Sequence, residues 1–121
     1  MTDDLKALAR RARLCRDWHY LPGMLIVDTT GKKQRFTHDD FSWKSTTRGV
    51  SSAIPDLSDK HTVDGLRELV SRAYGAEIAT QPIPSDDKWL LKLPHGNAIG
   101  DSLEDVLVQA LETANRFHSP A

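Results

Sequence analysis

Apolar residues recur every three or four positions in three stretches of the chain, and this spacing predicts three amphipathic helices. The first helix is expected to begin at Thr2 or Asp3, because either side chain can cap a first turn. It is expected to end between Trp18 and Tyr20, since Pro22 disfavours helical geometry in the residue before it. Its apolar face is formed by Leu5, Leu8, Ala12 and Cys15.

The other two predicted helices carry clear start and stop signals. Asp59, with Thr62 as a competing cap, opens the second helix, and Gly75 is suited to end it in a left-handed conformation. Ser102 caps the third helix, and Asp105 three residues later fits a variant of the capping box. The apolar stripes are Val63, Leu66, Leu69, Val70 and Ala73 in the second helix, and Leu103, Val106, Leu107, Ala110, Leu111 and Ala114 in the third, with Phe117 as a candidate extension.

Short apolar or alternating runs between the helices predict two β-hairpins. The first hairpin pairs residues 24–28 with 33–37 around a turn at Gly31. The second pairs residues 76–81 with 88–93. In its second strand one face carries Trp89, Leu91 and Leu93, and the other carries Lys88, Leu90 and Lys92.

Two segments give weaker signals. Residues 94–100 are rich in turn formers and are expected to link the second hairpin to the third helix. Residues 38–54 are expected to form a loop that Phe41 and Trp43 pin to the core, with an additional strand as the alternative.

The predicted class is α+β, in the order α-β-β-α-β-β-α. Because hairpins join antiparallel neighbours, we expect an antiparallel sheet of about four strands packed with three helices. A chain of 121 residues has room for a single domain. The pattern leaves open the strand order and whether the helices cover one sheet face or both.

Three stretches of the second half resemble small phage and prophage proteins that carry the phage ABA sandwich domain. They are residues 55–59 leading into 66–75, the strand centred on Trp89 and followed by Gly96, and the helix of residues 102–112. The opening helix and the turn at Pro22 and Gly23 agree with this resemblance. It implies a phage or prophage origin and a location in the host cytoplasm, and it supplies no catalytic residues.

Charge and cysteine content narrow the expected setting of the protein. Sixteen Lys and Arg residues against seventeen Asp and Glu give a formal net charge of -1, so no global attraction to nucleic acid or anionic membrane is expected. Cys15 is the single cysteine, which is typical of a reducing compartment. The acidic start lacks the layout of a signal peptide, and no apolar run approaches the ~20 residues of a membrane span. We therefore expect a cytoplasmic protein that does not engage membranes.

The groups that could carry catalysis or bind a metal are scattered along the sequence. The tightest cluster of metal-ligand types is His38-Asp39-Asp40, which reads as a polar turn without a second pair at metal spacing. Cys15 falls on an apolar helix face, an environment that opposes a reactive thiolate. Gly31-Lys32 lacks the other residues of a phosphate-binding loop. The sequence thus predicts a protein that is not an enzyme and has no metal or cofactor.

Three functional hypotheses follow. The leading one is a non-catalytic accessory protein that binds a host or phage protein, with Trp43 as a candidate interface anchor. The alternative is a nucleic-acid-binding module that uses the basic face of the first helix, where Lys6, Arg10 and Arg13 would contact phosphates. A third is a small enzyme with a site built from residues 38–54. A homodimer is compatible with a sheet that has an uncovered face or edge.

Overall fold

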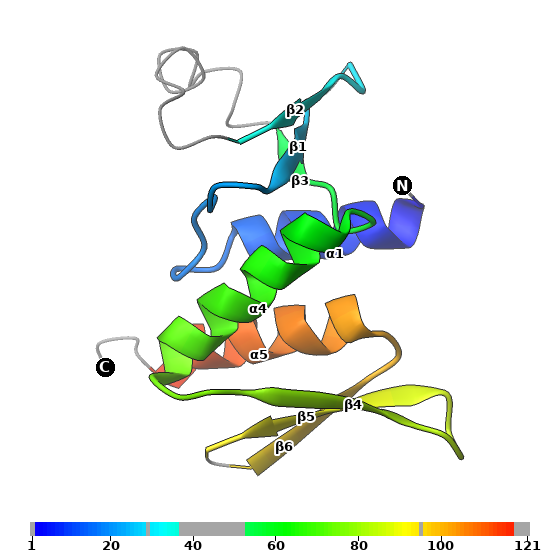
Figure 1. Ribbon diagram of the computed structural model, residues 1–121, viewed down its shortest axis with the longest axis vertical. Coiled ribbons are helices and arrows are strands. Elements are labelled where there is room, and N and C mark those ends of the chain that lie inside the picture. Colours follow the sequence, from blue (N-terminus) through cyan, green and yellow to red (C-terminus); the bar gives the residue numbers. More distant parts are fainter. Residues whose placement is uncertain (1, 29, 37–52, 95, 118–121) are drawn as a thin grey trace.

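The computed structural model describes residues 2–28, 30–36, 53–94 and 96–117, with residues 115–117 described by their backbone alone. In chain order the elements are α1 (Asp3–Arg13), β1 (Leu25–Val27), β2 (Lys33–Arg35), β3 (Ile54–Pro55), α4 (Lys60–Tyr74), β4 (Ala79–Ile83), β5 (Lys88–Leu93), β6 (Gly96–Gly100) and α5 (Leu103–Phe117). The three helices lie between two sheets, one at each end of the molecule (Figure 1). The α+β class is therefore confirmed.

The strands form two antiparallel three-stranded sheets, in the orders β2-β1-β3 and β4-β5-β6. The expected arrangement of both hairpins in one sheet of about four strands is not what the structure shows. Each hairpin gains its own third strand instead, because β1 pairs with β3 on its free side and β5 pairs with β6. The element order accordingly becomes α-β-β-β-α-β-β-β-α within the described ranges.

The sixth strand corrects the interpretation of residues 94–100 as a link. Leu93 pairs with Gly96, so the chain reverses within two residues and returns along β5 as far as Gly100. At Gly100 a Cβ atom would lie 2.9 Å from the backbone nitrogen of Val106. The glycines that resemble loop residues in the sequence therefore permit a tight return and a close approach of β6 to α5.

The first helix is shorter than expected. It ends at Arg13 rather than near Trp18, and the amide of Trp18 donates to the carbonyl of Cys15 in a separate turn. The reason lies in the packing of the aromatic residues that follow, since Trp18 and Tyr20 meet edge to face with ring centroids 5.4 Å apart. That contact needs a turning chain, which a continued helix would not provide.

The capping residues are confirmed in all three helices, but the capping box at Ser102 is not complete, because the side chain of Asp105 accepts from the amide of Asp101 and not from that of Ser102. The side chain of Thr2 accepts a hydrogen bond from the amide of Leu5 at 3.2 Å. Asp59 caps α4, and Gly75 ends it with φ of 65°. At the start of α5, the hydroxyl of Ser102 accepts from the amide of Asp105 at 3.0 Å. These hydrogen bonds satisfy amides that the first helical turns leave without a partner.

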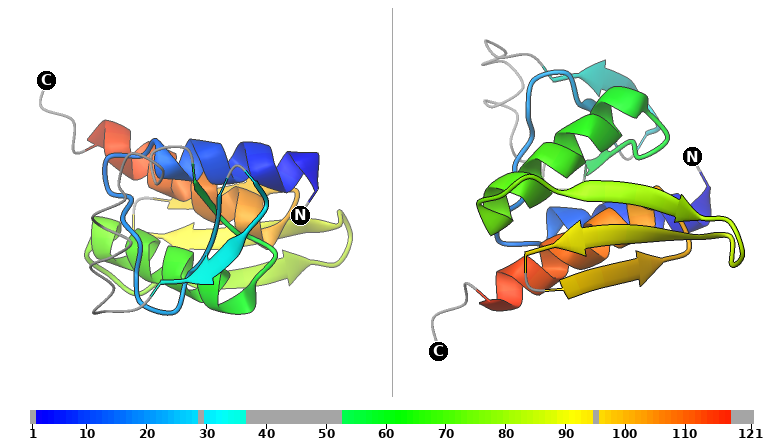
Figure 2. Two further views of the ribbon diagram at one scale, coloured as in Figure 1. Left: turned by 90° about the horizontal axis from the view of Figure 1, so that it is seen from above. Right: turned by 60° about the horizontal axis from the view of Figure 1, so that its bottom comes forward.

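One buried cluster joins the helices to both sheets. It contains residues of α1, β3, α4, β5 and α5, with Leu66, Leu91 and Leu107 fully buried at its centre. Helices α4 and α5 pack on each other and cover one face of β4-β5-β6, as the turned view shows (Figure 2). Helix α1 packs against α5 and β3. The predicted apolar stripes of α4 and α5 supply half of this cluster, whereas Ala9 of α1 is a buried position that the sequence pattern did not indicate.

Candidate functional site

The two faces of sheet β4-β5-β6 differ in what covers them. On the inner face Leu91 is fully buried, and Trp89, Leu93 and Ala98 pack partly buried against the core. On the outer face no described residue lies over the strands, and all three helices are on the opposite side (Figure 2). This outer surface, formed by Ala79, Gln81, Ile83, Lys88, Leu90, Lys92, Asn97 and Ile99, is called the open face below.

The strand register arranges the open face in rows. Its central row crosses the sheet as Gln81, Leu90 and Ile99. Ile99 is 54% exposed and is one of two large hydrophobic side chains that are clearly exposed among the described residues. The row beside it ends in Lys88, which forms an ion pair with Asp101 at 2.7 Å. The open face is thus an apolar pair, Leu90 and Ile99, with charged groups around it, a composition typical of contact surfaces.

The two edges of this sheet also differ. Edge strand β4 contains Pro82, which has no N–H and on an edge strand turns that side toward solvent. Backbone N–H and C=O groups point to alternate sides along an antiparallel strand. Pro82 pairs with Trp89, so the backbone groups of Trp89 point away from β4 and toward Gly100 of β6. The groups of Gly100 therefore point toward β5, and those of its neighbour Ile99 point away from β5. Strand β6 carries neither a proline nor a charged side chain. It therefore lacks the devices that commonly keep an edge from pairing.

The three basic residues predicted to contact phosphates differ in their contacts in the structure. A guanidinium nitrogen of Arg13 donates to the backbone carbonyl of Ala53 at 2.8 Å, so this side chain connects α1 to the chain before β3. The side chains of Lys6 and Arg10 form no hydrogen bond or ion pair with any described residue. The neighbouring Arg11 is held by Glu112 of α5 at 2.6 Å, and that contact raises the pKa of the guanidinium. Within the described ranges, two of the three candidates, Lys6 and Arg10, thus have side chains without a partner.

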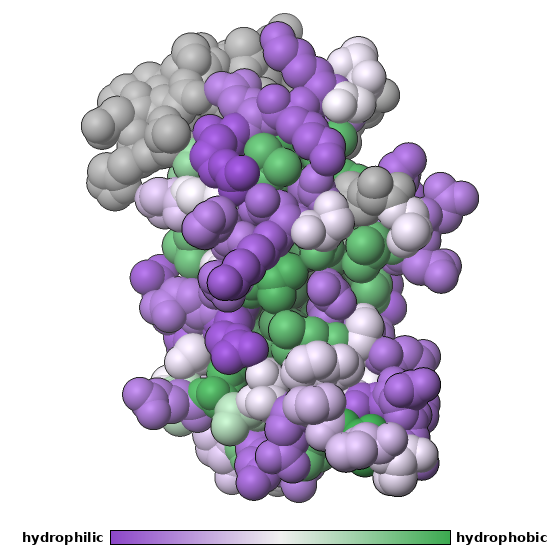
Figure 3. Space-filling view, turned by 45° about the vertical axis from the view of Figure 1, so that its right-hand side comes forward, coloured by the Kyte–Doolittle hydropathy of each residue, from purple (hydrophilic) through white to green (hydrophobic). Residues whose placement is uncertain are grey.

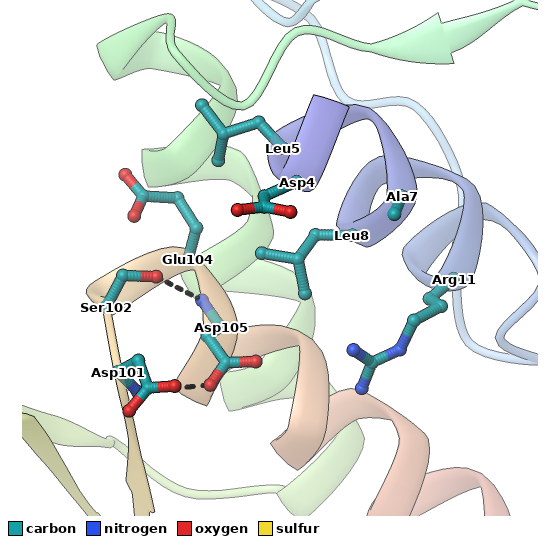
Figure 4. A pocket seen from close by; sticks show the side chains of 9 residues that line it. All are labelled: Asp4, Leu5, Ala7, Leu8, Arg11, Asp101, Ser102, Glu104 and Asp105. Carbon is teal, nitrogen blue, oxygen red and sulfur yellow. Dashed lines mark hydrogen bonds between the residues drawn. The ribbon is translucent and has the colours of Figure 1, made fainter. Parts of the chain in front are cut away.

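A groove of about 490 Å³ lies where the first turns of α1 and α5 approach each other (Figure 4). Four carboxylates line it, from Asp4, Asp101, Glu104 and Asp105, beside Leu5 and Leu8. On this side of the molecule, hydrophobic residues gather along the middle and hydrophilic residues flank them (Figure 3).

Structural contacts account for two of the groove carboxylates. The side chain of Asp105 accepts from the amide of Asp101 at 3.1 Å and from the amide group of Gln109 at 2.9 Å. Asp101 pairs with Lys88. Acidic residues in a first helical turn also complement the positive end of the helix dipole, which accounts for Asp4 and Glu104. The groove is therefore interpreted as a helix crossing.

A charged network that the sequence did not reveal joins β2 to the start of α4. Lys33 reaches the buried carboxylate of Asp56 at 2.8 Å, and Arg35 reaches Asp59 at 2.7 Å. Asp59 also accepts from Thr62, whose hydroxyl in turn accepts from the amide of Leu25 at 2.8 Å. Two cations on one face of β2 thus meet two carboxylates three residues apart. In the sequence, the alternation of Lys33 and Arg35 indicated that the two cations share one strand face. Their partners could not be predicted, because the positions of Asp56 and Asp59 relative to β2 depend on the fold.

Electrostatics indicates that both carboxylates of this network are ionised. Burial of Asp56 opposes its ionisation, but hydrogen bonds from Lys33 and Ser58 outweigh burial and lower its pKa. At Asp59 burial is likewise outweighed by hydrogen bonds from Arg35 and Thr62, which lower the pKa. Each carboxylate therefore has its hydrogen-bonding capacity directed to neighbouring strands and helix ends, which is a structural task.

The remaining candidate groups are not brought together. Cys15 is buried, and burial raises the pKa of its thiol to about 11, as predicted, although the residue lies beyond the end of α1 and not on its apolar face. Trp43 and the cluster His38-Asp39-Asp40 lie outside the described residues. Within the described ranges, no group of three His, Cys, Asp or Glu side chains is placed to hold a metal ion. Nor does any helix in those ranges have both the length and the apolar character to cross a membrane.

No protein-family model, curated protein or solved structure matches this chain. The fold and the surface define a small α+β protein with two three-stranded sheets, one of which presents an open face and an unguarded edge.

Proposed function

We propose that this chain is a non-catalytic accessory protein of a phage or prophage that acts in the host cytoplasm by binding another protein. The phage assignment rests on the three sequence stretches that resemble the phage ABA sandwich domain. Two of them, the Trp89 strand and the terminal helix, are β5 and α5, the elements that form and support the sheet with the open face.

The observation that carries the binding proposal is the exposure of Ile99, which ends the central row of the open face on edge strand β6. A side chain of this size loses roughly 1.5–3 kcal/mol of potential hydrophobic stabilisation when it stays in water. Leu90 beside it extends the apolar contact, and Lys92 and Lys88 supply charged groups on either side. A partner that covers this row would bury apolar area at the centre and meet charges at the rim, as protein interfaces do.

The alternative, nucleic-acid binding through α1, retains two of its three residues. Lys6 and Arg10 are unpaired among the described residues, whereas Arg13 is bound to the backbone of Ala53. Two phosphate contacts supply little affinity, because each neutralised phosphate contributes only one increment of counterion release. Protein binding is therefore the preferred proposal.

Site-specific photo-crosslinking in host cells tests the proposal. A photoreactive amino acid at position 99 is expected to give a discrete protein adduct, while the same residue at position 10, on the basic face of α1, is expected to give none. Adducts to nucleic acid at position 10, lost on the change Lys6→Glu, would favour the alternative. Equal adduct patterns at positions 10 and 99 would mean that the open face is not a specific binding surface.

A further inference from the structure

We infer that the β6 edge binds a second copy of this chain, so that two three-stranded sheets join into one antiparallel six-stranded sheet. This inference rests on the same open face as the proposed function and names one partner for it. The pairing places the two Ile99 residues opposite each other across a two-fold axis.

The backbone of β6 is suited to this pairing. The ladder directs the N–H and C=O groups of Ile99 away from β5, so each can bond to the same residue of the second copy. In the same register Asn97 lies opposite Asp101 of the second copy, whose carbonyl can accept from the Asn97 amide. The amide of Asp101 is already bound to Asp105, so the carbonyl is the group that remains. A two-fold axis uses the same patch twice, which is the usual geometry of a homodimer.

The side chains of the open face select this register among the alternatives. With Ile99 on the axis, the central row continues as Leu90, Ile99, Ile99 and Leu90, an apolar run shared by both copies. Moving the axis to Ala98 would place Ile99 opposite Asn97 instead. Apolar side chains directly opposite each other stabilise strand pairing more than an apolar and a polar one do.

The charges of the two copies also fit. In the Ile99-centred register, the row that contains Lys92 and Asn97 runs on into Asp101 and Lys88 of the second copy. Asp101 would then lie between two lysines, its present partner Lys88 and Lys92 from across the axis. No like charges face each other directly in this arrangement, so the surface is complementary to itself.

The strength of the pairing follows from its size. One five-residue edge on each side covers less than the ~800 Å² per partner of a standard stable interface. The dimer is therefore expected to form in a concentration-dependent manner and to dissociate on dilution.

Sedimentation of the full chain over a range of concentrations tests the inference, with a matched pair of variants. Ile99→Lys places a charge on β6, and Gln81→Lys places the same charge in the same row at the opposite edge, on β4. The unmodified chain and Gln81→Lys are expected to shift from monomer to dimer as concentration rises, while Ile99→Lys stays monomeric. A chain that is monomeric at every concentration, or a dimer that survives Ile99→Lys, would overturn the inference.

A cysteine pair provides the second readout. Ile99→Cys is expected to give a disulfide-linked dimer under mild oxidation, because residues opposite each other in a ladder lie within disulfide reach, whereas Gln81→Cys is expected to remain monomeric. Cys15 is buried and does not compete. Crosslinks from position 99 to a different protein in cells, together with a monomeric purified chain, would refute the dimer and leave the proposed function standing. A dimer of the purified chain, together with no crosslinks from position 99 to a different protein, would support the dimer and refute the proposed function.

Discussion

The two sheets of this protein are stabilised in different ways. Sheet β2-β1-β3 is tied to α4 by the charged contacts of Lys33 with Asp56 and of Arg35 with Asp59. Sheet β4-β5-β6 is built from two consecutive hairpins and packs its inner face on the helices through Leu91 and its neighbours. The first sheet therefore adds long-range polar contacts to the apolar burial of Ile26 and Ile54, while the second depends mainly on local pairing and apolar burial.

This difference has a functional side. Because the core supports the second sheet from one face alone, its other face can bind a partner without loss of the fold. The polar groups of the first sheet are already engaged with one another, as the low pKa values of Asp56 and Asp59 indicate. The proposed binding surface thus lies on the sheet whose polar groups take less part in holding the fold together.

The largest effect is expected from the core of the second sheet. Leu91→Ala removes a fully buried side chain at the centre of β5 and should lower the free energy of unfolding by about 2–5 kcal/mol. Urea denaturation followed by circular dichroism measures this change. The exposed neighbour Lys92→Ala is the control and should stay within about 0.5 kcal/mol of the parent chain. Equal losses for both variants would show that β5 does not pack as described.

A smaller effect is expected from the charged network. Asp56→Ala removes the partner of Lys33 and the hydrogen-bond acceptor for Ser58, and should cost about 1–3 kcal/mol by the same measurement. Asp86→Ala, in the exposed turn between β4 and β5, is the matched control and should change stability little. If Asp56→Ala proves neutral, the polar contacts do not stabilise the first sheet.

The smallest effect is expected from acid, which removes only the charges. The pKa values of Asp56 and Asp59 are lowered in the folded chain, so their ionised forms contribute stability at pH values above about 4, where unfolded carboxyls are ionised too. That contribution is lost as pH falls through the lowered folded values. Stability measured from pH 7 to pH 3 should decline more for the parent chain than for Asp56→Asn. If stability falls equally with pH in the parent chain and in Asp56→Asn, the ionisation of Asp56 does not contribute to stability.

Local signals made much of the fold predictable from the sequence. The caps at Asp59 and Ser102, the terminator Gly75 and the alternating faces of β5 depend on residues a few positions apart, so the sequence pattern contains them. The short strand β3 could not be predicted from such local signals, because its two residues, Ile54 and Pro55, acquire their strand geometry only by pairing with β1. Long-range pairing of this kind leaves almost no local trace.

The candidate site was predictable only in part. The sequence placed Leu90 on the same strand face as Lys88 and Lys92, but it left open whether helices cover that face. Ile99 was hidden, because its glycine-rich surroundings resemble a turn and gave no alternating pattern. The availability of Lys6 and Arg10 and the engagement of Arg13 could not be separated from sequence, since the partner of Arg13 lies 40 residues away.

The proline in β4 has a consequence for how copies of this chain can assemble. A strand that cannot donate at Pro82 is a poor template for an incoming strand, so the sheet can be extended at one end but not at the other. Repeated addition, which would build a filament, is thereby blocked after the first step. In the inferred dimer, the proline that looks like a defect in the ladder would limit association to a closed pair and would keep the protein from polymerising through its own sheet.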